Sequence, residues 1–383
     1  MQTFLYVLLA IATFGVLIVI HELGHFLVAR AFGVGIREFS IGMGPKLFSW
    51  RGKKSLARAD VREQADGREQ VTPLDFDDIE AGRSTPDAEP WDGTTVYSLR
   101  ALPIGGYVSM LGEDEDNDDP AAFNNKKVWQ RILVVVAGAA MNILLGFLLS
   151  LVLTLSAAQL ASTTVGQFEE GASSALYGLA VGDTVTHVNG VRVRTGNELV
   201  YEVMNSGYEP VDLRIIRDGT EMTLEGVIFP VTVTEGVAFG QADFRVFAEE
   251  KTLGSVIRHA FFRGASTVKM IFDQLGDLLT GRFGLNAMSG PVGVTDTMVT
   301  VAKSDMSTYL YLVLIITVNL GVFNLLPIPA LDGGRLLFLL VEAVTRKPVK
   351  REVEGMIHFV GMMLLLLLMF IITFKDITKL FIR

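Results

Sequence analysis

Four long apolar segments constrain the fold of this chain more than any other feature of its sequence. They cover residues 3–20 with a continuation to residue 29, then residues 132–161, 306–331 and 355–374. Each is close to the roughly 20 residues that an α-helix needs to cross the hydrocarbon core of a bilayer. Backbone amides inside a bilayer have no water to bond, so helices are the expected form of such segments. The sequence therefore predicts four transmembrane helices.

The composition predicts soluble parts between these helices and excludes several kinds of site. Hydrophobic residues make up 50% of the 383 residues, which is high for a soluble enzyme but low for a protein that lies wholly in the membrane. The formal net charge is -9, and no basic run resembles a nucleic-acid-binding patch, so we expect no nucleic-acid partner. The chain has no cysteine, which excludes disulfides, thiol nucleophiles and thiolate metal sites. Any metal must be bound by His, Asp or Glu.

Lysine and arginine residues cluster at one end of each apolar segment. They follow the first, precede the second and lie between the third and the fourth: Arg30, Arg37, Lys46, Arg51, Lys53, Lys54, Lys126, Lys127, Arg131, Arg346, Lys347, Lys350 and Arg351. Basic flanks favour the cytoplasmic side, so both termini and residues 162–305 are expected outside. Lys375, Lys379 and Arg383 oppose this orientation weakly. We predict a multi-pass protein of the cell's inner (plasma) membrane.

The segments between the helices differ in pattern. Residues 34–127 hold β-prone stretches around a polar, acidic insertion at about 55–93. Residues 162–232 contain short strands and the turn pairs Asn189-Gly190 and Asp218-Gly219. Residues 233–305 include an apolar face at helical spacing, either packed on its own domain or lying on the membrane surface or a substrate. The predicted regions are 1–33, 34–127, 128–161, 162–232, 233–305, 306–345 and 355–376.

The first apolar segment contains His21-Glu22-Leu23-Gly24-His25. On a helix, positions i and i+4 share one face, so His21 and His25 can bind one metal ion. Glu22 is offset by one position and can contact a water on that metal, which is the chemistry of the H-E-x-x-H motif. The alternative is that both histidines only make structural contacts in a helix bundle, but ionisable groups inside a span are expensive and usually functional.

Asp332 is the best candidate for a third metal ligand. A catalytic zinc takes three protein ligands and keeps one open position. His21 lies about 26 Å below the outer end of the first helix, and Asp332 lies at a similar depth in the third. Pro327 and Pro329 break that helix, and irregular backbone at this depth must be buried in protein or line a wet cavity. His358 stays open as another ligand, and Asp332 could instead cap the next helix.

These motifs together resemble the site-2 protease family, and among its members the bacterial RseP/RasP type. The resemblance rests on His-Glu-Leu-Gly-His, on Asn324-x-x-Pro327-x-Pro329-x-Leu331-Asp332-Gly333, and on Val-Gly-Asp and Val-Asn-Gly at 181–183 and 188–190. Residues 42–45, 103–108 and 289–293 add shorter matches. The resemblance covers almost the whole chain apart from the polar insertion.

The resemblance implies an intramembrane zinc endopeptidase that cleaves single-span membrane proteins, such as anti-sigma factors or signal-peptide remnants. His21, His25 and Asp332 would bind Zn²⁺, and Glu22 would be the general base. The implied fold is an α-helical membrane protein with four transmembrane helices, a membrane-associated, re-entrant β-hairpin region and an inserted PDZ-like α+β domain. The active site would face the cytoplasmic side. Candidate substrate-binding residues are Asn324, Pro327, Asn142, Gly105, Gly106 and Tyr107.

The sequence departs from the family's pattern in two places, and two other functions are alternatives to proteolysis. Residues 137–142, Ala-Gly-Ala-Ala-Met-Asn, lack the Pro that often precedes the Asn in this family, and residues 171–174 lack a Pro common in its PDZ-like domains. A catalytically silent substrate-binding protein of the same fold is disfavoured because ligands and base are intact. A solute transporter is disfavoured because no inverted repeat is detectable. The substrate's identity and the oligomeric state are not predicted.

Overall fold

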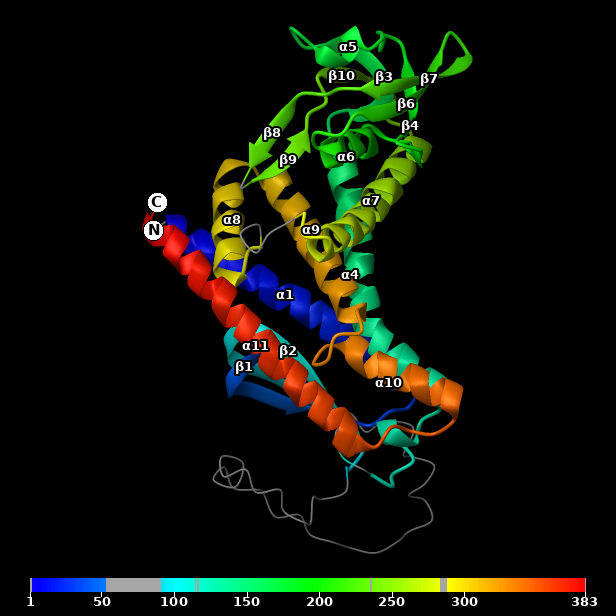
Figure 1. Cartoon of the computed structure of the whole chain (residues 1–383). Coiled ribbons are helices and arrows are strands. Elements are labelled where there is room, and N and C mark those ends of the chain that lie inside the picture. The colour runs from blue at the N-terminus through cyan, green and yellow to red at the C-terminus, as the bar shows by residue number, and fades with distance from the viewer. Residues whose placement is uncertain are drawn as a thin grey trace, which may run out of the picture. The chain divides into compact units, whose positions relative to one another are not determined.

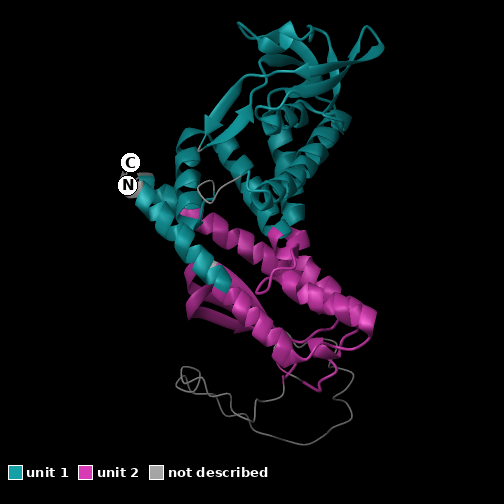
Figure 2. Ribbon diagram, viewed as in Figure 1, with its two compact units in different colours: residues 1–7, 142–322, 364–383 teal, residues 8–141, 323–363 magenta. Residues whose placement is uncertain are grey.

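The chain forms two compact units, shown in Figure 2. One comprises residues 1–7, 142–322 and 364–383, and the other comprises residues 8–141 and 323–363. We call them the first and the second unit. The computed structural model describes residues 2–52, 91–113, 115, 117–234, 236–282 and 288–382. The polar insertion predicted at about 55–93 therefore lies almost wholly outside the described residues.

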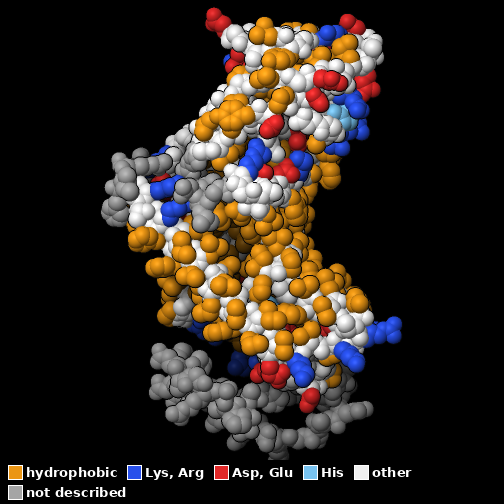
Figure 3. Space-filling view, viewed as in Figure 1, with side chains coloured by type: hydrophobic (Ala, Val, Ile, Leu, Met, Phe, Trp, Pro, Cys, Tyr) orange, Lys and Arg blue, Asp and Glu red, His pale blue; other side chains and the backbone are white. Residues whose placement is uncertain are grey.

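Four of the described helices are long and apolar enough to cross a membrane, as the sequence predicts. Helix α11 (Arg351–Ile382) is the most exposed of them. Only 6% of its most apolar stretch is buried inside the protein, and Figure 3 shows hydrophobic side chains gathered over it. Such a surface is stable in lipid, where no water has to be excluded from it. Figure 1 shows the four helices: α1 (Gln2–Ala31), α4 (Val128–Ser156), α9 (Met306–Leu325) and α11 (Arg351–Ile382).

The β-region of the second unit consists of two long antiparallel strands, β1 (Ile36–Arg51) and β2 (Val96–Met110). Each strand bends, so that residues 36–41 pair with 106–110 on one side and with 96–99 on the other. The second half of β1 then pairs with the first half of β2. Gly42 lies at one bend with φ of 85°, and a Cβ there would sit 2.5 Å from the Leu102 carbonyl oxygen. The result is a small sheet of four short segments whose two outer segments are 106–110 and 46–51.

Buried apolar residues join these strands to the helices of the second unit. The helices that contribute to this core include η2 (Phe123–Asn125), through Phe123, and α10 (Asp332–Thr345), through Leu339. Helix α1 approaches the strands closely at Gly15, where an added Cβ would lie 2.5 Å from the Pro103 carbonyl oxygen. The core contains Phe26, Ala29, Val34, Ile36, Phe39, Met110, Phe123, Val134, Val135 and Leu339.

The first unit contains a sheet in the order β10-β3-β4-β6-β7, with β5 paired to β4. Asn189 and Asp218 both have positive φ at its tight turns, which confirms the two turns predicted from Asn-Gly and Asp-Gly. The strands and helices are β3 (Leu160–Phe168), α5 (Ser173–Leu176), β4 (Thr184–Val188), β5 (Val191–Arg192), α6 (Gly196–Ser206), β6 (Val211–Arg217), β7 (Thr220–Val227), β8 (Val231–Thr234), β9 (Val237–Gly240) and β10 (Phe244–Glu249).

The helical region expected from residue 233 begins only at residue 253. Strands β9 and β10 occupy its first part, because their short apolar stretches complete β-sheets of this unit. Helix α7 (Leu253–Leu279) follows a capping box formed by Thr252 and Ser255, and α8 (Pro291–Ser304) starts with its proline. Helix α7 packs against α4, where a Cβ on Gly264 would lie 2.6 Å from the Phe147 ring. One face of α7 is therefore buried within its own unit.

Candidate metal centre

Three side chains from two distant parts of the sequence meet in the second unit. Nε2 of His21 lies 2.9 Å from Oδ2 of Asp332, and Nε2 of His25 lies 3.2 Å from the same oxygen. The two Nε2 atoms are 3.1 Å apart. Both imidazoles are buried. The three side chains expected to bind one metal ion thus lie within reach of a single ion.

This donor set fits a zinc ion. Zinc binds His nitrogen and carboxylate oxygen at about 2.0–2.2 Å, so neighbouring ligand atoms of a tetrahedron lie about 3.3 Å apart. The three distances among the donors of His21, His25 and Asp332 are close to that value. Nδ1 of His25 donates to the Val134 carbonyl oxygen at 2.8 Å, which leaves Nε2 free to bind a metal.

Two glycines allow the ligand-bearing helix to lie directly against α4. A Cβ on Gly24 would sit 2.3 Å from the Ala137 carbonyl oxygen. A Cβ on Gly138 would sit 2.3 Å from Nε2 of His25 and 2.8 Å from Nε2 of His21. Gly138 therefore shapes the metal centre, although the sequence analysis did not single it out. Its only signal is its place among small residues in a span, a pattern typical of close helix packing.

The break between α9 and α10 delivers the third side chain. Helix α9 ends at Leu325, the segment through Pro327 and Pro329 is irregular, and α10 begins at Asp332. A Cβ on Gly333 would overlap the Leu326 carbonyl oxygen, so only glycine fits after the aspartate. The two prolines thus end the spanning helix and let Asp332 enter at the start of the next one.

Helix α10 is fixed to its surroundings by two arginine–glutamate pairs. Arg131 of α4 donates to both carboxylate oxygens of Glu342, at 2.5 and 3.1 Å, and both side chains are largely buried. Arg335, one turn after Asp332, pairs with Glu113. A bidentate pair of this kind restricts orientation as well as distance. Helix α10 therefore holds its first residue, Asp332, in a defined position.

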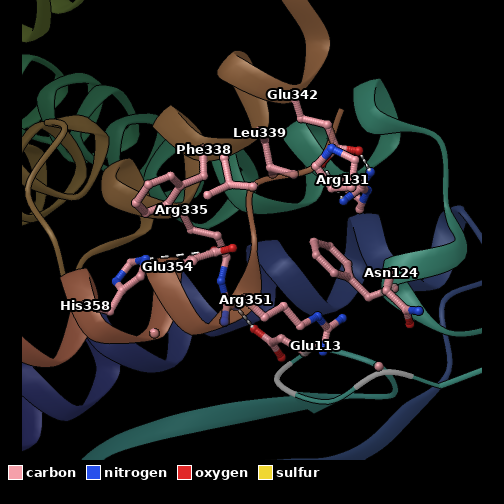
Figure 4. A pocket seen from close by; sticks show the side chains of 15 residues that line it. Glu113, Asn124, Arg131, Arg335, Phe338, Leu339, Glu342, Arg351, Glu354 and His358 are labelled. Carbon is pink, nitrogen blue, oxygen red and sulfur yellow. Dashed lines mark hydrogen bonds and ion pairs between the residues drawn. The ribbon is translucent and has the colours of Figure 1, made fainter. Parts of the chain in front are cut away.

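A cavity of about 490 Å³ lies beside α10, and Figure 4 shows the side chains that line it. Its polar lining consists mainly of arginines and glutamates that pair with one another, and none of the three candidate metal ligands lines it. Because its charges are paired, we assign it no binding role. The charged or titratable side chains in it are Glu113, Arg131, Arg335, Glu342, Arg351, Glu354 and His358.

Glu22 follows His21 on α1, and its carboxylate contacts the β-region. The backbone N–H of Val108 donates to Oε2 of Glu22 at 3.1 Å. Val108 pairs with Phe39 in the sheet, and its N–H points away from that partner toward the helix. Glu22 thus lies between the metal-ligand pair and the outer segment 106–110 of the small sheet.

The candidate substrate residues of the β-region occupy different positions. Gly106 packs closely inside the unit, since a Cβ there would lie 2.6 Å from the Ser40 carbonyl oxygen, and Gly105 has φ of 76° near Ile18. The Tyr107 hydroxyl accepts a hydrogen bond from Arg100 at 2.5 Å. Arg100 also pairs with Glu38 at 3.0 Å. The Tyr107 side chain is therefore part of a polar cluster on the sheet.

The remaining candidates are dispersed. Asn324 lies in the last turn of α9 and Pro327 in the break that follows. Asn142 is fully buried and belongs to the first unit, where its carbonyl oxygen accepts from Thr317 at 3.2 Å. Within the described residues, the group suited to a metal contains His21, His25 and Asp332 and does not include His358.

Comparison with known proteins agrees with this geometry. The model of Peptidase family M50 matches residues 9–57 and 88–368. The chain is 32% identical to the regulator of sigma-W protease RasP of Bacillus subtilis, over 97% of this chain and 98% of that protein. It is 32% identical to the zinc metalloprotease RasP of Geobacillus kaustophilus over 97% of each chain. A RasP from Bacillus licheniformis is 31% identical over 97% of this chain and 98% of that protein.

An H-E-x-x-H helix, a distant aspartate beside it and four membrane-spanning helices define a zinc metalloendopeptidase that works within the membrane, of the site-2 protease type. The matched region covers most of the sequence, and three relatives are aligned over nearly their full length. The chain belongs to peptidase family M50.

Proposed function

We propose that the chain cleaves a peptide bond within the membrane segment of a single-span protein, with His21, His25 and Asp332 as zinc ligands and Glu22 as the general base. The observation that carries the proposal is the meeting of three ligand atoms at 2.9–3.2 Å beside Glu22. Four helices suited to a membrane support an embedded site.

Each side chain has a defined part in this proposal. Zinc, when bound, polarises the scissile carbonyl and lowers the pKa of a bound water toward 7. Glu22 accepts the proton of the attacking water and later donates it to the leaving amine. The Val108 N–H holds one carboxylate oxygen of Glu22 at 3.1 Å and leaves the other oxygen available. The base is thus oriented before the substrate arrives.

The substrate must be unwound before it can be cleaved, because helix carbonyls are bonded within the helix. Residues 106–110 form one of the two outer segments of the small sheet, with no further strand beside it among the described residues. An unwound substrate can add to such an edge by main-chain hydrogen bonds. A strand added there passes beside Glu22, since Val108 already points its N–H at that side chain. Gly105 and Gly106 lie at the start of this edge segment, and Asn324 and Pro327 lie eight and five residues before Asp332 in the sequence.

We further infer the orientation and the role of the first unit's sheet. The basic flanks favour outside termini and a cytoplasmic active site. The sheet with α6, and its Val-Gly-Asp and Val-Asn-Gly turns, support a PDZ-like domain outside the cytoplasm. Such a domain would hinder substrates whose outer domain is still intact. RasP of Bacillus subtilis is named as a regulator of sigma-W, and an anti-sigma factor or a signal-peptide remnant is the substrate class that we infer.

The proposal is tested with purified protein in detergent and a single-span reporter. Wild type should cleave the reporter and contain one zinc per chain. Asp332→Ala should lose both zinc and cleavage, whereas Glu22→Gln should lose cleavage and keep zinc. A wild-type protein that binds the reporter but never cleaves it would favour the alternative, a catalytically silent substrate-binding protein. Full zinc in Asp332→Ala would show that the ligand set is wrong.

A further inference from the structure

The backbone of Ala330 adopts an unusual conformation next to the metal centre. Ala330 lies two residues before Asp332 and has φ of 74°. This is the left-handed region, where the Cβ of an L-residue is crowded and where glycine is the usual occupant. Such a conformation persists when the surrounding structure holds it. The position of Asp332 therefore depends on whatever holds Ala330.

His358 of α11 makes a direct contact with this backbone. The Ala330 N–H donates to Nδ1 of His358 at 2.9 Å. Because Nδ1 is the acceptor, the ring proton of a neutral His358 is on Nε2, which faces Oε1 of Glu354 at 4.0 Å. The ring also packs against Phe338 of α10, with the ring centroids 5.6 Å apart. Figure 4 shows His358, Glu354 and Phe338 together.

Close packing leaves the irregular segment little room to move. Gly361 lies one turn after His358, and a Cβ there would be 2.3 Å from Cβ of Pro329. A Cβ on Gly334 would be 2.7 Å from the Ile328 carbonyl oxygen and 3.2 Å from Cε1 of His358. Helix α11, the irregular segment and the start of α10 thus pack closely at Gly361 and Gly334, where a larger residue would not fit. A shift of His358 would be transmitted to Asp332 through this contact.

We propose that His358 is a positioning residue for the metal centre, which holds Ala330 through Nδ1 and thereby places the Asp332 carboxylate beside His21 and His25. This inference rests on the proposed role of Asp332 as a zinc ligand. It gives His358 a role different from that of an alternative metal ligand, because Nδ1 accepts from a backbone N–H and His358 lies outside the group suited to a metal. Outer partners of this kind commonly change metal affinity by about 10–100-fold.

The test exploits the two ring nitrogens. The side-chain amide of Asn places an acceptor where Nδ1 lies, and that of Gln places its polar atoms near the position of Nε2. His358→Asn should bind zinc within about threefold of wild type, whereas His358→Gln and His358→Leu should bind it at least about tenfold more weakly. Chelator competition in detergent measures the affinity. The visible spectrum of the Co²⁺-substituted protein should change in the Gln and Leu variants and not in the Asn variant.

Matched variants keep the outcomes separate. Glu354→Gln removes the charge that faces Nε2 and leaves the Ala330 contact, so zinc affinity should stay at the wild-type value. If His358→Leu also unfolds at a lower temperature, the positioning role is judged from the zinc affinities of His358→Asn and His358→Gln, because both variants carry polar amides. Equal zinc affinities of His358→Asn and His358→Gln, or a wild-type affinity of His358→Leu, overturn the positioning role. Loss of zinc in Asp332→Ala but not in His358→Leu would refute only this inference, whereas retention in Asp332→Ala would refute the ligand assignment itself.

Discussion

The backbone N–H of Val108 lies 3.1 Å from the Oε2 atom of Glu22, so an edge of the β-region and the helix that carries the metal ligands share a hydrogen bond. A hydrogen bond to a charged group contributes about 1.5–3 kcal/mol, more than a typical neutral one. This bond orients the carboxylate relative to the histidine one residue before it. It also places the sheet edge next to the group proposed to move the proton.

Replacement of Val108 tests that link. Val108→Pro removes the N–H but no bond between strands, because this N–H points away from Phe39 toward Glu22. Cleavage should fall roughly tenfold to a hundredfold, as expected for the loss of one charged hydrogen bond, while zinc content stays unchanged. Val108→Ala keeps the N–H and is the control. A lower kcat at unchanged KM indicates a misplaced Glu22, because this N–H is already donated to the Glu22 carboxylate. Equal cleavage by the two variants would contradict this orienting role.

Glu22→Gln tests the proton transfer itself. Gln has nearly the same shape, and its carbonyl oxygen can still accept from Val108, so the contact with the β-region is retained. The amide cannot take a proton from water, and kcat should fall by about 10²–10⁴-fold, the usual contribution of a general base. Zinc content and unfolding temperature should match those of wild type, because Glu22 is outside the ligand group. Substantial cleavage by this variant would mean that another group is the base.

Gly138→Ala should disrupt the metal centre by steric pressure alone. The added Cβ would lie 2.3 Å from Nε2 of His25, so the imidazole must move away from its partners. Gly146→Ala on the same helix is a matched control, since its Cβ would lie 2.3 Å from a side-chain carbon of Val318. Both variants should lower the unfolding temperature, but only Gly138→Ala should bind less than one zinc per chain. Equal zinc contents would show that the histidines can adjust.

The elements that depend on one-dimensional patterns could be predicted from the sequence. Helices α1, α4, α9 and α11 follow from apolar length, because the bilayer thickness sets the length of a span. The meeting of His21 with His25 follows from helical spacing. The approach of Asp332 follows from depth, because two helices that run in the same direction bring equal depths together. The break before Asp332 follows from two prolines.

Features that depend on packing between distant segments could not be predicted. The pairing of residues 36–41 on both sides results from bends in β1 and β2, and an alternating pattern alone does not specify such bends. Gly138 matters because it has no side chain, so it carries no chemical signal. From the sequence, His358 could be considered only as a possible metal ligand. Its contact with Ala330 depends on how α11 packs against the irregular segment, which the sequence does not specify. Strand β10 lies far along the sequence from its partner β3.

Excision of the sheet from the first unit tests its proposed role as a filter. The structure indicates where to cut: β3 starts at Leu160, and β10, which pairs with β3, ends at Glu249. Removal of the predicted domain, residues 162–232, alone would leave β10 without its sheet and expose apolar surface. Lys251 donates to the carbonyl oxygens of Leu155 and Ala157 at 2.6 and 2.8 Å, so the two cut ends lie side by side. A short glycine linker can therefore join Ala157 to Lys251.

The excised protein should discriminate less between substrates. Wild type is expected to cleave a reporter with a trimmed outer domain much faster than one with the whole domain, because a folded domain outside the membrane obstructs the approach. Removal of the sheet should raise cleavage of the long reporter and leave the rate for the short one nearly unchanged, since His21, Glu22, His25 and Asp332 all lie in the second unit. Zinc content provides the control for an intact metal centre. If the excised protein retains full zinc and the long reporter remains as resistant as before, the filter role is wrong, and the sheet has another function.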